Sequence, residues 1–143
     1  MRYRLLISAL ALAGCSSGLL ESVTSPPSGL AVSVTSSFLP GIVPTTGSIS
    51  GQGDSVIAIV SRPATCGKTL SADAGKTAVG LVVTIILTSD AVQSCAPLNG
   101  MTTYRAVVRN VPAGAYDASA HLRFAGIGGN ADTTVAQATI VIP

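Results

Sequence analysis

The chain contains a single histidine, His121, so chemistry that needs an imidazole depends on this residue and a multi-histidine metal site is excluded. Activation of a serine nucleophile requires a histidine and a carboxylate that orients its ring. Asp117 precedes His121 by four residues, which on a β-strand places both side chains on one face but about 13 Å apart. The chain also lacks the Gly-x-Ser-x-Gly motif that presents the serine of many hydrolases. These residues therefore predict a solvent-facing strand histidine and no catalytic site.

The acidic and glycine residues outline no recognisable ion or phosphate site. The aspartates are Asp54, Asp73, Asp90, Asp117 and Asp132. They lack the spacing of an EF-hand, so calcium could bind only where separate loops meet in space. The glycine-rich stretch 126–129 lacks the Lys-Ser/Thr pair and helix of a phosphate-binding loop, so it indicates a hairpin turn. Tryptophan, the best sugar-stacking residue, is absent. We expect no metal and no cofactor.

The N-terminus has the layout of a secretory signal. Arg2 and Arg4 precede an apolar run over 5–13, and small residues follow it. The run is too short for a transmembrane helix, which needs about 20 apolar residues. We therefore expect this segment, as a helix, to direct export and to be removed.

The end of this segment, Leu12-Ala13-Gly14-Cys15, resembles the lipobox of bacterial lipoproteins at all four positions. The resemblance implies that the Cys15 thiol carries a diacylglyceryl group, that cleavage leaves Cys15 first, and that its amine is acylated, for instance by palmitate. Several acyl chains give stable membrane attachment. A serine directly after the lipidated cysteine, as Ser16 is here, resembles the residue with which such proteins are by default sorted to the outer membrane. The alternative is an ordinary secretory signal with a chance cysteine at its cleavage site.

The resemblance divides the chain into a signal peptide (1–14), a lipidated flexible tether (15–29) and one domain (30–143). The tether is rich in Ser, Gly and Pro. Arg2 and Arg4 belong to the signal, so eight Lys and Arg minus two leaves six, against six Asp and Glu. The mature chain is then neutral, and its composition gives no indication of nucleic-acid binding.

With Cys15 lipidated, Cys66 and Cys95 remain as a pair in an oxidising compartment, and we expect a disulfide between them. Such a bond would stabilise the fold by about 3.5 kcal/mol on the chain-entropy model. Two free thiols, or half of a metal site, are the alternative. The paired Cys-x-x-Cys spacing of zinc sites is absent.

Beyond the tether, Val, Ile and Thr are abundant whereas long polar helix formers are few, which predicts strands and few helices. The expected strands are 30–35, 55–61, 79–88, 103–111, 115–124 and 133–142, with a short one at 48–50. The stretches 37–53, 63–77, 89–100 and 125–132 have turn composition and are expected to connect them. In 115–124 the even positions are apolar and face inward, whereas Ser119, His121 and Arg123 face outward. Tyr104 and Tyr116 are expected in or at the edge of the core.

Residues 104–118 carry a second resemblance. They are similar to the strand, Val-Pro-Ala-Gly-x-Tyr turn and strand near the end of many bacterial immunoglobulin-like and transthyretin-like sandwiches. This implies an all-β, antiparallel sandwich of about seven strands. The resemblance specifies architecture and not ligand, because such sandwiches host many functions.

Together these features predict a lipid-anchored lipoprotein of the bacterial cell envelope, in the outer membrane. We expect a non-enzymatic structural or protein-interaction module. Its partners would be the membrane, through Cys15, and an envelope protein or glycan, with no nucleic acid. The alternative is a small-ligand or carbohydrate-binding surface lipoprotein, and an enzyme or enzyme inhibitor comes third.

Overall fold

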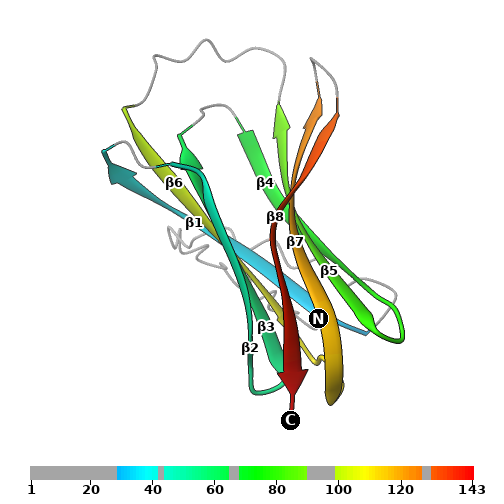
Figure 1. Cartoon of the computed structure of the whole chain (residues 1–143). Helices are drawn as coiled ribbons and strands as arrows, with labels where there is room; N and C mark the ends of the chain where they lie inside the picture. Colours follow the sequence, from blue (N-terminus) through cyan, green and yellow to red (C-terminus); the bar gives the residue numbers. More distant parts are fainter. Residues whose placement is uncertain (1–28, 42–43, 65–67, 90–98, 127–129) are drawn as a thin grey trace, which may run out of the picture.

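The computed structural model describes residues 29–41, 44–64, 68–89, 99–126 and 130–143, and these residues form strands and connections without a helix. Eight strands build two facing four-stranded sheets, which confirms an all-β sandwich (Figure 1). The strands are β1 (Ala31–Pro40), β2 (Thr46–Gln52), β3 (Ser55–Pro63), β4 (Lys68–Lys76), β5 (Gly80–Ser89), β6 (Gly100–Arg109), β7 (Gly114–Gly126) and β8 (Ala131–Ile142).

Sheet I has the strand order β1-β6-β3-β2 and is antiparallel throughout, whereas sheet II has the order β4-β5-β7-β8 and contains one parallel pair, β5 and β7. The expectation of a wholly antiparallel sandwich was therefore wrong for this pair. The reason is the path of the chain. After β5 it crosses to sheet I for β6 and then returns, so that two reversals restore the original direction in β7.

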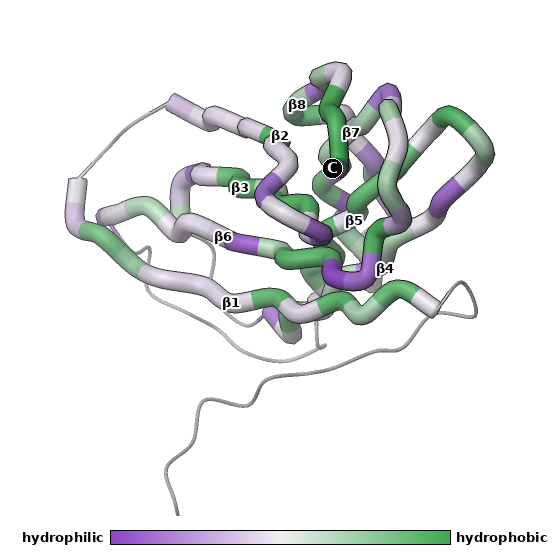
Figure 2. The backbone as a smooth tube through the Cα atoms, turned by 90° about the horizontal axis from the view of Figure 1, so that it is seen from below, coloured by the Kyte–Doolittle hydropathy of each residue, from purple (hydrophilic) through white to green (hydrophobic). Residues whose placement is uncertain are grey.

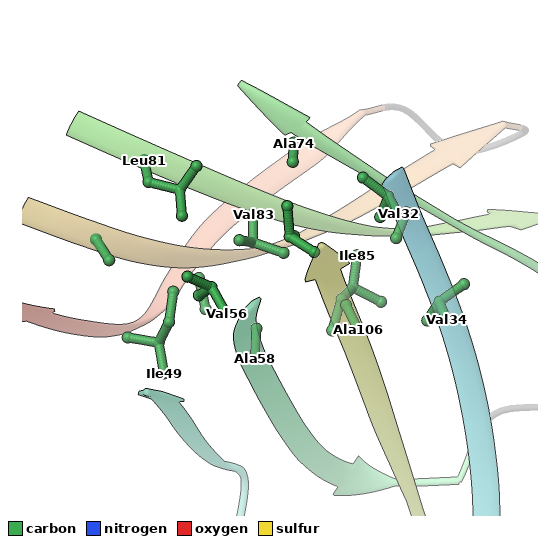
Figure 3. Close-up of a cluster of buried hydrophobic side chains, with 14 of the residues drawn as sticks. Val32, Val34, Ile49, Val56, Ala58, Ala74, Leu81, Val83, Ile85 and Ala106 are labelled. Carbon is green, nitrogen blue, oxygen red and sulfur yellow. The ribbon is translucent and has the colours of Figure 1, made fainter. Parts of the chain in front are cut away.

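The core lies between the sheets, and in β3 its residues follow the alternation of a strand. In β3, Val56, Ala58 and Val60 are fully buried, while the residues between them are half-buried. Figure 3 shows how side chains from both sheets meet in this layer. Tyr104 and Tyr116 are also buried in it, as the sequence predicted. Burial of each Val, Leu or Ile side chain stabilises the fold by about 1.5–3 kcal/mol, so this layer is the main source of stability.

Two segments expected to be connections are strands. Residues 63–77 were expected to form a long turn-bearing connection, but Lys68–Lys76 is β4, in which Leu70, Ala72 and Ala74 face the core. The polar and small residues that suggested turns lie on the other face of this edge strand, where water solvates them. Similarly, β1 continues to Pro40 and β2 covers Thr46–Gln52, so that the loop expected over 37–53 is mostly strand.

The Pro112-Ala113-Gly114 reversal carries the chain from sheet I to sheet II, because β6 and β7 belong to different sheets. Its geometry is held by hydrogen bonds at both ends. The Tyr116 hydroxyl donates to the Pro112 carbonyl oxygen at 2.8 Å, and the Val111 amide donates to the Asp54 carbonyl oxygen at 2.9 Å. Asn110 precedes the turn with a φ of 62°, a conformation that asparagine tolerates better than most residues.

The edge strands β2 and β8 lie against each other and close one side of the sandwich (Figure 2). Two β2 glycines permit this approach. A Cβ atom on Gly47 would lie 2.5 Å from the Val135 carbonyl oxygen, and one on Gly51 would lie 3.3 Å from the Val141 carbonyl oxygen. Val135 is the extra residue of a β8 bulge, since Ala120 pairs with Ala136 but His121 pairs with Thr134.

Candidate functional site

The solvent-facing side of sheet II carries a hydrogen-bonded cluster around His121. The His121 Nδ1 atom lies 2.9 Å from Asp132 Oδ1, and Asp132 Oδ2 accepts hydrogen bonds from Arg123 Nε at 3.1 Å and Nη2 at 2.9 Å. The other ring nitrogen, Nε2, lies 3.2 Å from Ser119 Oγ and 3.5 Å from Thr134 Oγ1. We call these five residues the His121 cluster.

The β7–β8 hairpin assembles this cluster. Ser119, His121 and Arg123 alternate on the outer face of β7, as the sequence predicted, and the hairpin places Thr134 opposite His121 and Asp132 opposite Arg123. In the sequence, Asp132 was one of five aspartates without the spacing of a known ion site. A hairpin folded symmetrically about the expected connection 125–132 would have placed Thr134 opposite Arg123, so the sequence pattern offered no signal for the contact between Asp132 and Arg123.

The charges of the cluster stabilise the ionised Asp132 carboxylate. Its hydrogen bond from His121 lowers the pKa of Asp132 most, the hydrogen bonds from Arg123 lower it further, and partial burial opposes both effects. The side chains are partly exposed, at 25% for His121, 38% for Asp132 and 47% for Arg123. Water therefore screens the ion pair, and we expect a contribution to stability below about 1 kcal/mol.

The hydrogen-bond order Asp132–His121–Ser119 is that of a serine hydrolase triad, with the carboxylate at Nδ1 and the hydroxyl at Nε2. Asp117, which was expected on the same strand face as His121 but too far away to pair with it, accepts a hydrogen bond from Thr139 at 3.1 Å. Catalysis also needs donors for the oxyanion. Ser119 lies in the middle of β7, which is paired on both sides with β5 and β8, so the neighbouring amides are engaged in the sheet. Thr134 also competes for Nε2.

An open hollow of about 380 Å³ adjoins the cluster on the same face of sheet II. Its polar lining residues are Asp117, Ser119, Gln137 and Thr139, from neighbouring positions of β7 and β8. A carboxylate, two hydroxyls and an amide can donate to and accept from a hydroxyl-rich molecule. Ser119 belongs both to the hollow and to the His121 cluster.

A second group of charges lies next to Phe124, which follows Arg123 in β7 but packs against the core. Arg62 stacks on the Phe124 ring with its guanidinium carbon 4.4 Å from the ring centre. Lys68 lies 6.0 Å from the same ring and donates a hydrogen bond to Ser89. The Nη1 atom of Arg62 is buried and has no hydrogen-bond partner within the part of the chain that the structure describes. The ring thus offers this cation a favourable cation–π contact.

Several of the residues singled out in the sequence lie outside the described residues. These are Cys15 with the lipobox and tether, Cys66 and Cys95, Asp90, and the glycine-rich stretch from residue 127 to 129. Gly126 ends β7 and Ala131 begins β8, so the glycine-rich stretch does connect a hairpin. Within the described ranges, no three His, Cys, Asp or Glu residues come together as ligands for a metal ion. Those same ranges also contain no helix that is long and apolar enough to span a membrane.

Three comparisons bear on the ancestry of this domain. They covered protein-family models, curated proteins and solved structures. The chain matches none of them.

Proposed function

We propose that the protein is a lipid-anchored, non-enzymatic interaction module of the bacterial cell envelope, attached through Cys15 to the outer membrane. The lipobox-like Leu12-Ala13-Gly14-Cys15 and the following tether support the anchor. The domain is immunoglobulin-like or transthyretin-like in this proposal. Support comes from the Tyr116 hydroxyl, which bonds four residues back at the crossing between sheets, as in the tyrosine corner of immunoglobulin-type sandwiches.

One observation carries the non-enzymatic assignment. The groups best suited to chemistry satisfy one another on an open sheet face, and the amides next to Ser119 are used by the strand ladders. Such a face suits recognition, because its paired side chains are already ordered and lose little entropy when a partner binds. The partner surface in this proposal is the outer face of β7 and β8.

The enzymatic alternative is tested with an activated aryl ester such as p-nitrophenyl acetate. We expect the full-length chain and its Ser119→Ala variant to hydrolyse the ester at the same rate. A rate for the parent chain at least about a hundredfold above that of Ser119→Ala, as serine catalysis through a base would give, would overturn the assignment.

The anchor and the binding face are tested separately in bacterial cells. Labelled palmitate should enter the parent chain and Cys66→Ser but not Cys15→Ser, and equal labelling of all three would contradict the anchor. For the face, a photo-cross-linking amino acid replaces either Gln137, on the outer side of β8, or Gln52 on β2; both side chains are exposed. Cross-links to one envelope component from position 137 alone support the proposal, whereas equal patterns from both positions count against it.

The hollow favours a second candidate function, the binding of a small hydroxyl-rich ligand such as a carbohydrate. Its lining groups are the hydrogen-bonding types that recognise sugar hydroxyls. A glycan array should then give hits that the Gln137→Ala variant loses and the Gln52→Ala variant keeps. An array without specific hits leaves the interaction module as the better assignment.

A further inference from the structure

The four edges of the two sheets differ in how they are protected against pairing with another chain. Exposed edge strands are normally covered, charged or distorted, because their free amide and carbonyl groups attract further strands. The β2 and β8 edges lie against each other, with Gly47 and Gly51 facing the β8 backbone. β4 carries Lys68, Asp73 and Lys76. Three of the four edges thus have a recognisable protection.

The remaining edge strand, β1, lies near β4 over its first residues, but within the described part of the chain its second half is neither covered, charged nor distorted. Its ten residues include no charged side chain. It pairs with β6 without a register shift from Ala31, opposite Arg109, to Pro40, opposite Gly100. An uncharged, regular and long edge is the type of edge that natural sandwiches usually avoid.

The accessible part of this edge is its second half. Residues 31–34 are mostly buried and lie near β4, whereas every residue from Thr35 to Pro40 is exposed. This half runs away from β4 and from sheet II in Figures 1 and 2. Phe38 and Leu39 are 50% and 61% exposed and are among the few large apolar side chains that face solvent. The edge therefore offers both free backbone groups and apolar contacts on its two faces.

We infer that the second half of β1 is a docking strand for the same strand of a second copy of this chain. Antiparallel pairing about a two-fold axis joins the two copies of sheet I into one sheet through identical surfaces. The absence of charge favours this occupant, because residues that face their own copies across the axis would repel each other if charged. Among the exposed residues, Thr35 to Leu39 keep their backbone N–H groups whereas Pro40 has none, so the pairing segment is centred on Ser37. With the axis at Ser37, each Phe38 lies opposite the other copy's Ser36 and each Leu39 opposite the other copy's Thr35.

This register makes the charge at position 37 decisive, because each copy's residue 37 faces its equivalent directly. When all copies carry Ser37→Lys, or all carry Ser37→Glu, like charges face each other across the axis. Each of these variants should therefore pair about fivefold more weakly than the parent. A mixture of the two variants places opposite charges across the axis and restores pairing between them. Ser48→Lys and Ser48→Glu are the matched controls, since Ser48 is exposed on the same outer face of sheet I but lies on the β2 edge that β8 covers.

The test uses the full-length chain, expressed with its own N-terminus in bacteria as two differently tagged copies. A photo-cross-linking amino acid at position 38 should join the two tags, and each position-37 variant alone should reduce this product by about fivefold. The Lys and Glu mixture should recover it, and the position-48 variants should leave it unchanged. Circular dichroism and thermal melting of each purified variant check that it remains folded. The inference is overturned if the tags are not joined, if position 38 reacts only with other proteins, or if the mixture recovers nothing. None of these outcomes depends on lipidation at Cys15 or on the binding face of sheet II.

Discussion

Substitution of Gly47 tests directly how the sandwich closes between β2 and β8. In Gly47→Ala the new Cβ atom would lie 2.5 Å from the carbonyl oxygen, 2.9 Å from the carbonyl carbon and 3.1 Å from the Cβ atom of Val135. Two of these atoms belong to the β8 backbone, so no side-chain rotation relieves the clash. Overpacking of this kind costs about 1–3 kcal/mol, which exceeds the roughly 0.5–1 kcal/mol that alanine gains over glycine in a strand.

The matched control is Gly75→Ala in β4. Both glycines are exposed residues within edge strands with ordinary φ values, but a Cβ atom on Gly75 would meet nothing within 4 Å. We expect Gly47→Ala to unfold with a free energy about 1–2 kcal/mol below that of the parent, which lowers the melting temperature by roughly 4–8 °C, and Gly75→Ala to be as stable as the parent or slightly more so. Urea and thermal unfolding measure both. Equal stabilities of the two variants within about 0.5 kcal/mol would refute the close approach of β2 and β8.

Two further substitutions test the crossing between the sheets and the His121 cluster. Tyr116→Phe removes the hydroxyl that donates to the Pro112 carbonyl oxygen, while the ring remains buried. We expect the free energy of unfolding in urea to fall by about 1 kcal/mol, because only the hydrogen bond is lost. An unchanged urea midpoint would contradict this bond. Asp132→Asn removes a carboxylate whose pKa is lowered in the folded chain by His121 and Arg123. The parent should therefore be more stable than the variant at neutral pH, and this difference should disappear as the pH falls through the lowered pKa. A difference in stability that does not change with pH would contradict the ion pair.

The pattern of apolar residues was sufficient to predict the all-β sandwich and most of its strands. The apolar positions that were expected to face inward are buried at Val56, Ala58 and Val60 of β3 and at Ala118, Ala120 and Leu122 of β7, whereas Phe124 is half-buried. β4 was missed because its outer face carries Thr69, Ser71, Asp73 and Gly75, which resemble turn residues. Such residues are compatible with an edge strand once Leu70, Ala72 and Ala74 have the opposite sheet to pack on. Only the tertiary structure supplies that sheet.

The parallel pairing of β5 with β7 could not be read from the sequence either. The turn at 112–114 indicates that the chain reverses, but not whether the next strand pairs with β6 or joins the other sheet. In the structure the next strand joins the other sheet, and the Tyr116 hydroxyl donates a hydrogen bond across this turn to the Pro112 carbonyl oxygen. Local sequence thus specified the turn, while the choice of sheet depended on which surface could bury the apolar face of β7.

The composition of the His121 cluster depends on the same bulge that closes the sandwich. On β8 the even residues from Ala136 to Ile142 pair with inward-facing residues of β7, and unbroken alternation would turn Asp132 inward as well. Because Val135 is an extra residue, the parity changes there and Asp132 emerges beside Arg123 on the outer face. A sequence pattern gives no warning of such a shift, which is why Asp117 and not Asp132 was first considered as the partner of His121.

Val135 therefore links Gly47 on one side to the His121 cluster on the other, and this link gives a prediction independent of stability. If an alanine at position 47 displaces the Val135 backbone, the His121 hydrogen bond that most lowers the pKa of Asp132 should lengthen. Carboxyl-detected NMR titration should then show the pKa of Asp132 rising toward its ordinary value in Gly47→Ala, while Gly75→Ala titrates like the parent. A folded Gly47→Ala chain with an unchanged Asp132 titration would mean that the bulge absorbs the displacement, and that packing and electrostatics are uncoupled at this edge.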